Sequence, residues 1–278
     1  MDNKLKKERL KIRIWGARGS VPSPGKAFDR YGGDTTCVEI PRYNIIMDAG
    51  TGIRKLGMKL LQEDRVQSPL HIFFSHYHWD HIQGLPFFLP IYMEGKEVHL
   101  YGMGDVSEIL SEQMRPPYFP MPYKALTAQI VHHTIDIGDE IKLKQGVTLT
   151  FYPTRHPQET LAMRIRTPEG IFIFSTDHEH DAVYCKELGK GFQRFTANVD
   201  AMLVDCQYTD NEYEKKIGWG HSSVSQVIKL ANDCRPRKLL LSHHDPMHTD
   251  SMVRTIEKDV QNFYAETHAC RSTEEIIV

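Results

Sequence analysis

The sequence predicts an α+β fold in which two β-sheets pack face to face and helices cover their outer sides. Short apolar segments typical of strands occur in both halves of the 278-residue chain, and amphipathic helical segments follow them in each half. No linker interrupts this pattern, and no repeat with a period of about 20 to 50 residues is present. A single domain spanning residues 1–278 is therefore expected.

The first elements are strands joined by glycine-rich turns. Residues 11–15 alternate apolar and polar side chains, as a half-buried strand does, and the loop 16–33 that follows is too rich in glycine and proline to be regular. Residues 36–40 and 44–47 are expected to pair as a hairpin. A helix should begin near Gly52, because apolar side chains then recur on one helical face.

The next predicted strand, residues 70–74, delivers an unusual run of polar side chains onto the loop beyond it. Three histidines and one aspartate fall within six positions there: His76, His78, Asp80 and His81. Imidazole and carboxylate are the ligands that borderline divalent metals prefer. Surface histidines are the alternative interpretation, in a chain with 15 of them.

The middle of the chain has a different character. Residues 106–114 could form a helix, whereas residues 115–123 contain four prolines among aromatic side chains and cannot be helical. We expect an extended, stiff arm that could cover the site or contact a second subunit. An ordinary structured loop is the alternative.

The second half of the chain again combines strands with helices. One amphipathic helix is expected after Ser222 and Ser223, which provide the cap, and another over about residues 251–266. The expected strands are residues 129–135, 140–143, 147–152, 161–166, 171–174, 201–204 and 239–241.

Further potential metal ligands stand where predicted strands end. His156, Asp177 and His243 each close an apolar strand of the second half, and Asp48 closes one in the first half. Each residue alone could be a turn residue. Together with the run after residue 74, they indicate a common site at one end of the strands.

The run His-x-His-x-Asp-His and the order of these later residues resemble the metallo-β-lactamase superfamily. The resemblance implies a four-layer αββα sandwich of two mixed sheets flanked by helices. It also implies that Asp48 is the structural aspartate of the metal loop and that Asp177 bridges two metals. The implied ligands are His76, His78 and His156 for one ion, and Asp80, His81 and His243 for the other, although His244 could replace His243.

Two such cations roughly 3.5–4 Å apart lower the pKa of a shared water, so that hydroxide forms near neutral pH. They also bind substrate oxygens and neutralise developing charge. A ligand set of nitrogen and carboxylate without thiolate favours two zinc ions, with manganese or iron as alternatives.

Residues 201–225 resemble the tRNase Z-like and cyclic-nucleotide phosphodiesterase branches of the superfamily. In those branches a His-Ser-Ser or His-Ser-Thr element places a histidine beside the metals, oriented by an acidic residue. The implied pair here is His221 and Asp205, with Asp80 as the third catalytic residue. A proton donor suits phosphodiester cleavage, since the alkoxide leaving group is a strong base. A histidine that only precedes a capped helix is the alternative for His221.

Two further residues are candidate substrate contacts. The loop Trp-Gly-Ala-Arg-Gly-Ser resembles the same branch, and its backbone N–H groups could cradle a phosphate. Arg18 in this loop and Ser222 beside His221 are candidates by type and location. A solvated surface charge is the ordinary alternative for Arg18.

The bulk properties limit the function classes. A formal net charge of −2 argues against a broad basic surface for duplex nucleic acid. The sequence contains no run of eighteen apolar residues of the kind that spans a membrane. The charged N-terminus has no apolar segment typical of a secretory signal. Five scattered cysteines form no disulfide framework. A cytoplasmic enzyme is expected.

The expected activity is that of a metal-dependent phosphoric diester hydrolase. It would cleave a small phosphodiester such as a cyclic nucleotide by attack of a metal-bridged hydroxide. A tRNase Z-like RNA endonuclease is one alternative, although no inserted tRNA-gripping arm is present in the sequence. A lactone or ester hydrolase, and a binding module with structural metals, are the others. Dimers are common in this branch, so a homodimer is a further expectation.

Overall fold

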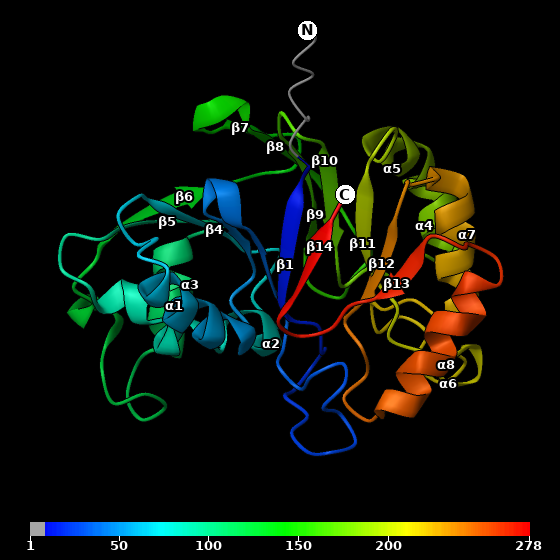
Figure 1. Ribbon diagram of the computed structural model, residues 1–278, viewed down its shortest axis with the longest axis horizontal. Helices are drawn as coiled ribbons and strands as arrows, with labels where there is room; N and C mark the ends of the chain where they lie inside the picture. Colours follow the sequence, from blue (N-terminus) through cyan, green and yellow to red (C-terminus); the bar gives the residue numbers. More distant parts are fainter. Residues whose placement is uncertain (1–8) are drawn as a thin grey trace, which may run out of the picture.

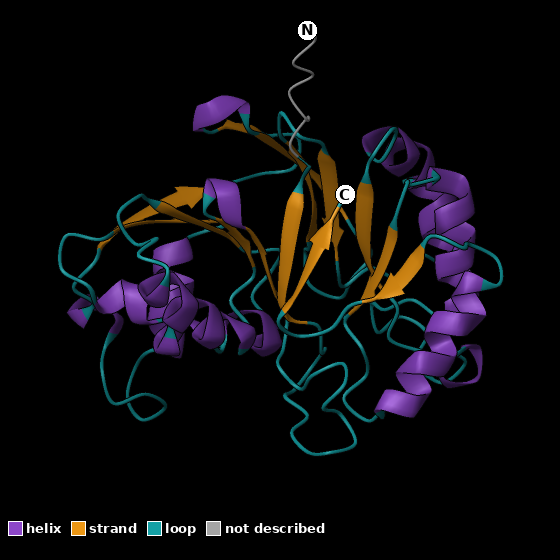
Figure 2. Ribbon diagram, in the orientation of Figure 1, coloured by secondary structure: helices purple, strands orange, loops and turns teal. Residues whose placement is uncertain are grey.

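Two mixed β-sheets of seven strands face one another in the computed structural model, which describes residues 9–278 (Figure 1, Figure 2). Helices cover the outer face of each sheet, so the layers are helix, sheet, sheet, helix. The predicted fold class is confirmed. The two sheets have the same arrangement of antiparallel and parallel strand pairs. Each has three antiparallel strand pairs toward one side and three parallel pairs toward the other.

The first sheet is built almost entirely from the first half of the chain. The exception is the last strand of the chain, which pairs antiparallel with the first, with Lys11 opposite Ile277. Its strands, in spatial order, are β14 (Glu274–Ile277), β1 (Lys11–Gly16), β2 (Cys37–Ile40), β3 (Ile45–Met47), β4 (Leu70–Phe73), β5 (Glu97–Gly102) and β6 (Gln129–Thr134).

The second sheet contains strands from the second half only. Its strands, in spatial order, are β13 (Thr267–Ala269), β12 (Leu239–Ser242), β11 (Ala201–Asp205), β10 (Ile171–Ser175), β9 (Leu161–Arg166), β8 (Thr148–Pro153) and β7 (Glu140–Lys142). The expected strands of this half are all present, and β13 is an addition that the sequence pattern did not indicate.

The helices lie on the outer faces because each has one apolar side. In α1, the buried residues Ile53, Leu56 and Leu60 recur at helical spacing. Burying one such side chain stabilises the fold by about 1.5–3 kcal/mol. The helices are α1 (Gly52–Gln62), α2 (Trp79–Ile82) and α3 (Val106–Gln113) on the first sheet, then α4 (Ala182–Glu187), α5 (Gly189–Phe195), α6 (Asp210–Tyr213), α7 (Val224–Cys234) and α8 (Asp250–Gln261). Short 3₁₀ helices are Pro41–Tyr43, Leu85–Phe87, Leu89–Tyr92, Tyr123–Ala125 and Lys144–Gly146.

Three apolar cores hold the four layers together. One lies between the sheets and includes Phe73 and Phe174. Another lies between the first sheet and its helices around Leu56, and the third between the second sheet and its helices around Val227. The helix α7 begins at the expected serines, where Ser223 and Gln226 form a reciprocal capping box.

Residues 115–123 are not the extended arm that their proline content predicted. Tyr118 and Phe119 both donate their backbone N–H to the carbonyl of Arg115, so the segment forms turns. The ring of Phe119 is partly buried against the core under the helices, and it meets Phe87 edge-on at 5.8 Å. The apolar side chains draw this segment back onto the outer layer.

Within residues 9–278, no helix is long and apolar enough to cross a membrane.

Candidate metal centre

The carboxyl ends of strands from both sheets meet at one edge of the sandwich. The run after β4 comes from the first sheet, while His156, Asp177 and His243 follow β8, β10 and β12 of the second. Asp48 and Asp177 adopt left-handed backbone conformations, with φ of 58° and 54°, and His243 does so with φ of 57°. This conformation is uncommon outside glycine, and it often marks functional sites.

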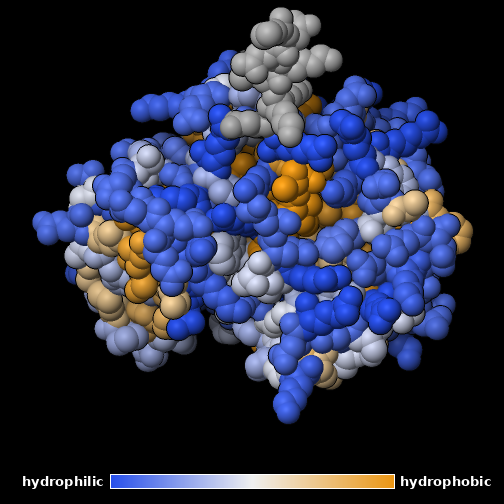
Figure 3. Space-filling view, in the orientation of Figure 1, coloured by the Kyte–Doolittle hydropathy of each residue, from blue (hydrophilic) through white to orange (hydrophobic). Residues whose placement is uncertain are grey.

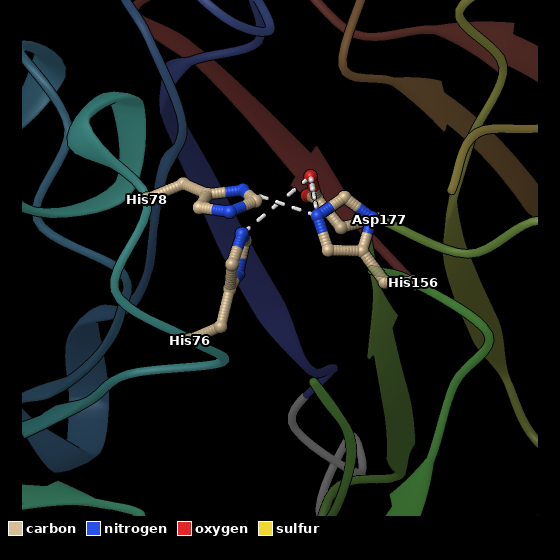
Figure 4. Close-up of side chains that lie close together, drawn as sticks. All are labelled: His76, His78, His156 and Asp177. Atoms are coloured by element: carbon tan, nitrogen blue, oxygen red, sulfur yellow. Dashed lines mark hydrogen bonds and ion pairs between the residues drawn. The ribbon is translucent and has the colours of Figure 1, made fainter. Parts of the chain in front are cut away.

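One cluster consists of His76, His78, His156 and Asp177, whose side chains converge in Figure 4. The Nε2 atom of His156 lies 3.1 Å from Nδ1 of His78. The Nε2 atoms of His76 and His156 are each 3.8 Å from Oδ1 of Asp177. Four potential ligand atoms therefore surround one point.

A second cluster consists of Asp80, His81 and His243. The Nε2 atoms of His81 and His243 are 3.3 Å apart, and Oδ2 of Asp80 lies 3.3 Å from the first and 3.1 Å from the second. The other oxygen of Asp177, Oδ2, lies 3.1 Å from Nε2 of His81 and 3.4 Å from Nε2 of His243. Asp177 thus presents one oxygen to each cluster, as a bridging carboxylate would.

The donor atoms fit divalent cations. Nε2 of His76 and Oδ2 of Asp177 are buried and have no hydrogen-bond partner in the structure. Buried polar atoms are normally paired, so one such unpaired atom in each cluster is explained by an ion bound there. Imidazole and carboxylate suit zinc, manganese and iron. The two clusters are consistent with a dinuclear metal site.

Hydrogen bonds behind the clusters fix how the histidines face. Asp48 accepts from Nδ1 of His81 at 2.7 Å and from the backbone N–H of Ser75 at 2.7 Å. The Gly220 carbonyl lies 3.1 Å from Nδ1 of His156. Each contact engages Nδ1, so that Nε2 faces the cluster. Contacts behind metal-binding histidines commonly orient the rings in this way.

Buried charges set the protonation of the site. Burial lowers the pKa of His76 far below its usual range, which favours the neutral imidazole that binds metals. Burial would raise the pKa of Asp177, but the neighbouring His243 and His81 hold it well below its ordinary value. The carboxylate of Asp177 therefore stays ionised.

His221 and Asp205 form a hydrogen-bonded pair beside both clusters. Nδ1 of His221 lies 2.7 Å from Oδ2 of Asp205, and His221 lines the pocket that opens onto the site. Oδ1 of Asp205 accepts the backbone N–H groups of Gln207 and Ser222, so the carboxylate is held from several sides. Oδ2 of Asp205 is also 3.4 Å from Nδ1 of His243.

The loop before His221 is held by Glu179. This carboxylate accepts from the hydroxyl of Tyr213 at 2.6 Å and from the backbone N–H groups of Gly218 and Gly220. Glu179 follows closely after Asp177 in the sequence, so a support role could be expected for it. Its partners in the loop could not be read from the sequence.

Arg18 does not reach the site, which corrects the expectation of a substrate contact. Its side chain is fully buried, and its guanidinium donates to the backbone carbonyls of Gly32, Asp245 and His248. Burial lowers its pKa. Arg18 ties the loop 16–33 to the segment after β12.

Ser222 is also engaged within the fold, which corrects its expected role as a substrate contact. The side chain is buried, and Oγ donates to the carbonyl of His178 while accepting the N–H of His180 at 3.0 Å. Its hydroxyl is used in positioning the loop beside Asp177.

The loop 16–33 contributes contacts that were not predicted. The backbone N–H of Ser20 donates to Oδ2 of Asp80 at 2.6 Å. Gly19 lies against His243 so closely that a Cβ there would stand 2.4 Å from Nδ1 of the ring. The glycines of this loop were visible in the sequence, but their partner lies more than two hundred residues further along the chain.

A larger hollow of about 840 Å³ lies elsewhere and does not contain these clusters. Arg9, Arg164 and Lys238 are among its lining residues. Within residues 9–278, the groups that could hold a metal are confined to the edge where the strands end.

The fold and the site together define a metal-dependent hydrolase of the metallo-β-lactamase superfamily. Residues 43–244 match the family described as Beta-lactamase superfamily domain, and the chain belongs to that family. The expected family is thereby confirmed.

Similar proteins extend over almost the whole chain. Ribonuclease Z of Thermoplasma acidophilum is 21% identical and covers 93% of each chain. The probable metallo-hydrolase YhfI of Bacillus subtilis is 23% identical over 91% of this chain and 94% of its own. The crystal structure of YhfI superposes with a TM-score of 0.73 at 18% identity, covering 98% of this chain and 100% of that one. A diphosphatase from the PhnP family has a TM-score of 0.68 at 17% identity, with 96% and 97% covered.

Proposed function

We propose that the protein is a dinuclear metal phosphodiesterase that cleaves a small phosphodiester such as a cyclic nucleotide. The observation that carries this proposal is the 2.7 Å contact between His221 and Asp205 beside both metal clusters. Expulsion of an alkoxide from a phosphodiester benefits from such a proton donor, whereas hydrolysis of an activated ester with an acidic leaving group needs none.

Each part of the site has a task in this reaction. Two divalent ions bound by the clusters would acidify a water molecule and polarise the phosphoryl oxygens. His221 would donate a proton to the leaving oxygen, while Asp205 stabilises the imidazolium and fixes its ring. Asp80 and Asp177 balance the positive charge of the site. Zinc is the first choice of metal from the nitrogen and oxygen ligands, with manganese and iron next.

The similar proteins agree with chemistry at phosphorus. Two of them are named as a ribonuclease and a diphosphatase. RNA is therefore retained as the alternative substrate, and a substrate screen must include it.

The test uses leaving groups of different basicity. His221→Ala should slow hydrolysis of a 2′,3′-cyclic nucleotide by roughly 10²–10⁴-fold, because its alkoxide needs a proton. It should slow bis-p-nitrophenyl phosphate far less, since p-nitrophenolate leaves without one. Steady-state rates of the metal-loaded wild type and variant provide the measurement, and Asp80→Ala serves as the metal-site control.

Metal analysis of the same variant excludes loss of metal as the cause of a slower rate. His221→Ala must keep the metal content of the wild type, because His221 also lies among possible ligands with Asp177 and His243. Equal slowing of both substrates would contradict the proton-donor role. Hydrolysis of a precursor tRNA or a lactone, with no turnover of small phosphodiesters, would contradict the proposed substrate class.

A further inference from the structure

The indole of Trp79 is exposed at the mouth of the metal site. Its exposed fraction is 80%, the largest among the large apolar side chains of residues 9–278. A single exposed apolar side chain is ordinary on a protein surface. What distinguishes Trp79 is that its large, flat indole also lines the pocket over the metal clusters, where it offers an aromatic face to a ligand.

The pocket that includes Trp79 is otherwise polar. Its volume is about 450 Å³, and its other lining residues are Ser20, Tyr77, His78, Asp80, Asp177, His221 and His243. The hydroxyl of Tyr77 already donates to the carbonyl of Met103 at 2.8 Å, and its ring lies 5.7 Å from that of Phe74. Trp79 thus supplies the free apolar wall of a pocket whose floor carries the metal ligands.

The backbone of Trp79 is held between residues of the two clusters. Trp79 is the first residue of α2, and its carbonyl accepts the N–H of Gln83 at 2.7 Å. Its neighbours His78 and Asp80 belong to the two different clusters. In the described part of the chain, no side-chain hydrogen bond or ring contact engages the indole. A flat group can therefore rest on the free face of the indole while a phosphate of the same molecule reaches the clusters.

We propose that Trp79 is the base-binding wall of the pocket, and that the substrate phosphodiester carries a nucleobase that stacks on the indole. The inference rests on the proposed function and narrows its substrate class. Nucleobases stack on aromatic side chains through their π-faces, largely without regard to base identity. A nucleotide also places its base one sugar away from its phosphate, so both ends can be held at once.

A second copy of the chain is the competing partner for the exposed surface of Trp79. Apolar side chains also gather over the helices that cover the first sheet (Figure 3), and Tyr118 is 76% exposed. The polar, ligand-bearing floor beneath Trp79 favours a charged small molecule over an apolar protein surface. Self-association is therefore an outcome for the experiment to detect.

The experiment compares the binding of two phosphates that differ only by a base. Adenosine 5′-monophosphate and ribose 5-phosphate are titrated into the zinc-loaded protein by calorimetry. Trp79→Ala should weaken binding of the nucleotide about tenfold more than binding of ribose 5-phosphate, from the loss of one stacked base. Trp79→Phe should restore most of the affinity. Phe263→Ala, which removes a 69% exposed ring outside the pocket, is the control and should change neither.

A kinetic comparison gives a second readout. Thymidine 5′-p-nitrophenyl phosphate and methyl p-nitrophenyl phosphate share a leaving group but differ in the base. Trp79→Ala should reduce kcat/KM for the first substrate about tenfold more than for the second.

Distinct results separate this inference from the proposed function. If the wild type binds the nucleotide no more tightly than ribose 5-phosphate, base stacking is wrong even when phosphodiesters are cleaved. If Trp79 governs nucleotide binding but no phosphodiester is cleaved, the inference stands and the proposed function fails. If Trp79→Ala converts an oligomer to a monomer in sedimentation and leaves nucleotide binding intact, Trp79 contacts a second copy of the chain and the inference is wrong.

Discussion

His243 and His244 are adjacent in sequence but have opposite surroundings. Burial alone would lower the pKa of His243, but Asp177, Asp80 and Asp205 together raise it to about 9. The ring of His244 points elsewhere, with Nε2 3.1 Å from the carbonyl of Cys270. Burial and the charge of Arg18 lower its pKa to about 3. The two imidazoles therefore form a matched pair for a test of the ligand assignment.

Replacing each histidine by alanine should give different metal contents. His243→Ala should lose about half of the bound zinc, because one cluster is left with two protein side chains and a shared carboxylate. His244→Ala should keep the wild-type zinc content and lose thermal stability instead, since it leaves a buried carbonyl unpaired. Elemental analysis and a thermal melt on both variants provide the measurement. Retention of full zinc by His243→Ala would reject the assignment.

Residue types in the sequence predicted potential ligands better than substrate contacts. A histidine or aspartate at a strand end must lie at the sheet edge, because strand geometry fixes its position. The direction of a long side chain such as that of Arg18 depends on distant segments. Its guanidinium binds carbonyls more than two hundred residues away, and no local pattern records this.

At the scale of elements, three neighbouring parallel strands carry a stack of histidines away from the metals. His71 on β4, His99 on β5 and His133 on β6 have ring centroids 4.9 Å and 5.1 Å apart in succession. His71 is bonded to the hydroxyl of Tyr101 at 3.1 Å, and His99 faces Glu97. Burial, followed by the charges of His99 and His133, lowers the pKa of His71 to about 4.

This stack should make the fold sensitive to acid. The unfolded chain protonates His71 near pH 6.5 and the folded chain only near pH 4, so the unfolded state binds more protons between these values. The free energy of unfolding gains a contribution that is present above pH 6.5 and is lost as the pH falls toward 4. His71→Gln removes it, so its Tm should fall less steeply with pH than that of the wild type. Melts of both chains across this window, each compared at equal zinc content, provide the measurement; parallel curves would contradict the prediction.

Some elements could not be predicted because distant partners define them. The strand β14 has four residues and pairs with β1 from the other end of the chain. The last helix was expected to extend to residue 266 but ends at Gln261, and Thr267 already begins β13. Apolar periodicity indicated that a helix was present, but tertiary pairing decided where it ended.

At the scale of the whole molecule, the two mirrored sheets explain why ligands so far apart in sequence meet. The carboxyl ends of β4 in the first sheet and of β8, β10 and β12 in the second lie at the same edge, and the loops beyond them collect the polar side chains. The alternation of apolar and polar side chains, and the polar residues at the ends of predicted strands, indicated that potential ligands meet at one edge, because both patterns depend on local strand geometry. The conformations of the loop 16–33 and of the segment 115–123 depend on contacts with distant parts of the chain. They could therefore not be predicted from composition.

The central claim is that this edge holds two divalent ions that share Asp177. Zinc is removed from the purified protein with a chelator and then titrated back by calorimetry. The wild type should bind two ions per chain, and Asp177→Asn should bind fewer or more weakly. Asp200→Asn, whose carboxylate pairs with Arg237 away from the clusters, should behave as the wild type. A wild type that binds a single ion, or an Asp177→Asn variant that still binds two with unchanged affinity, would contradict the shared two-metal site.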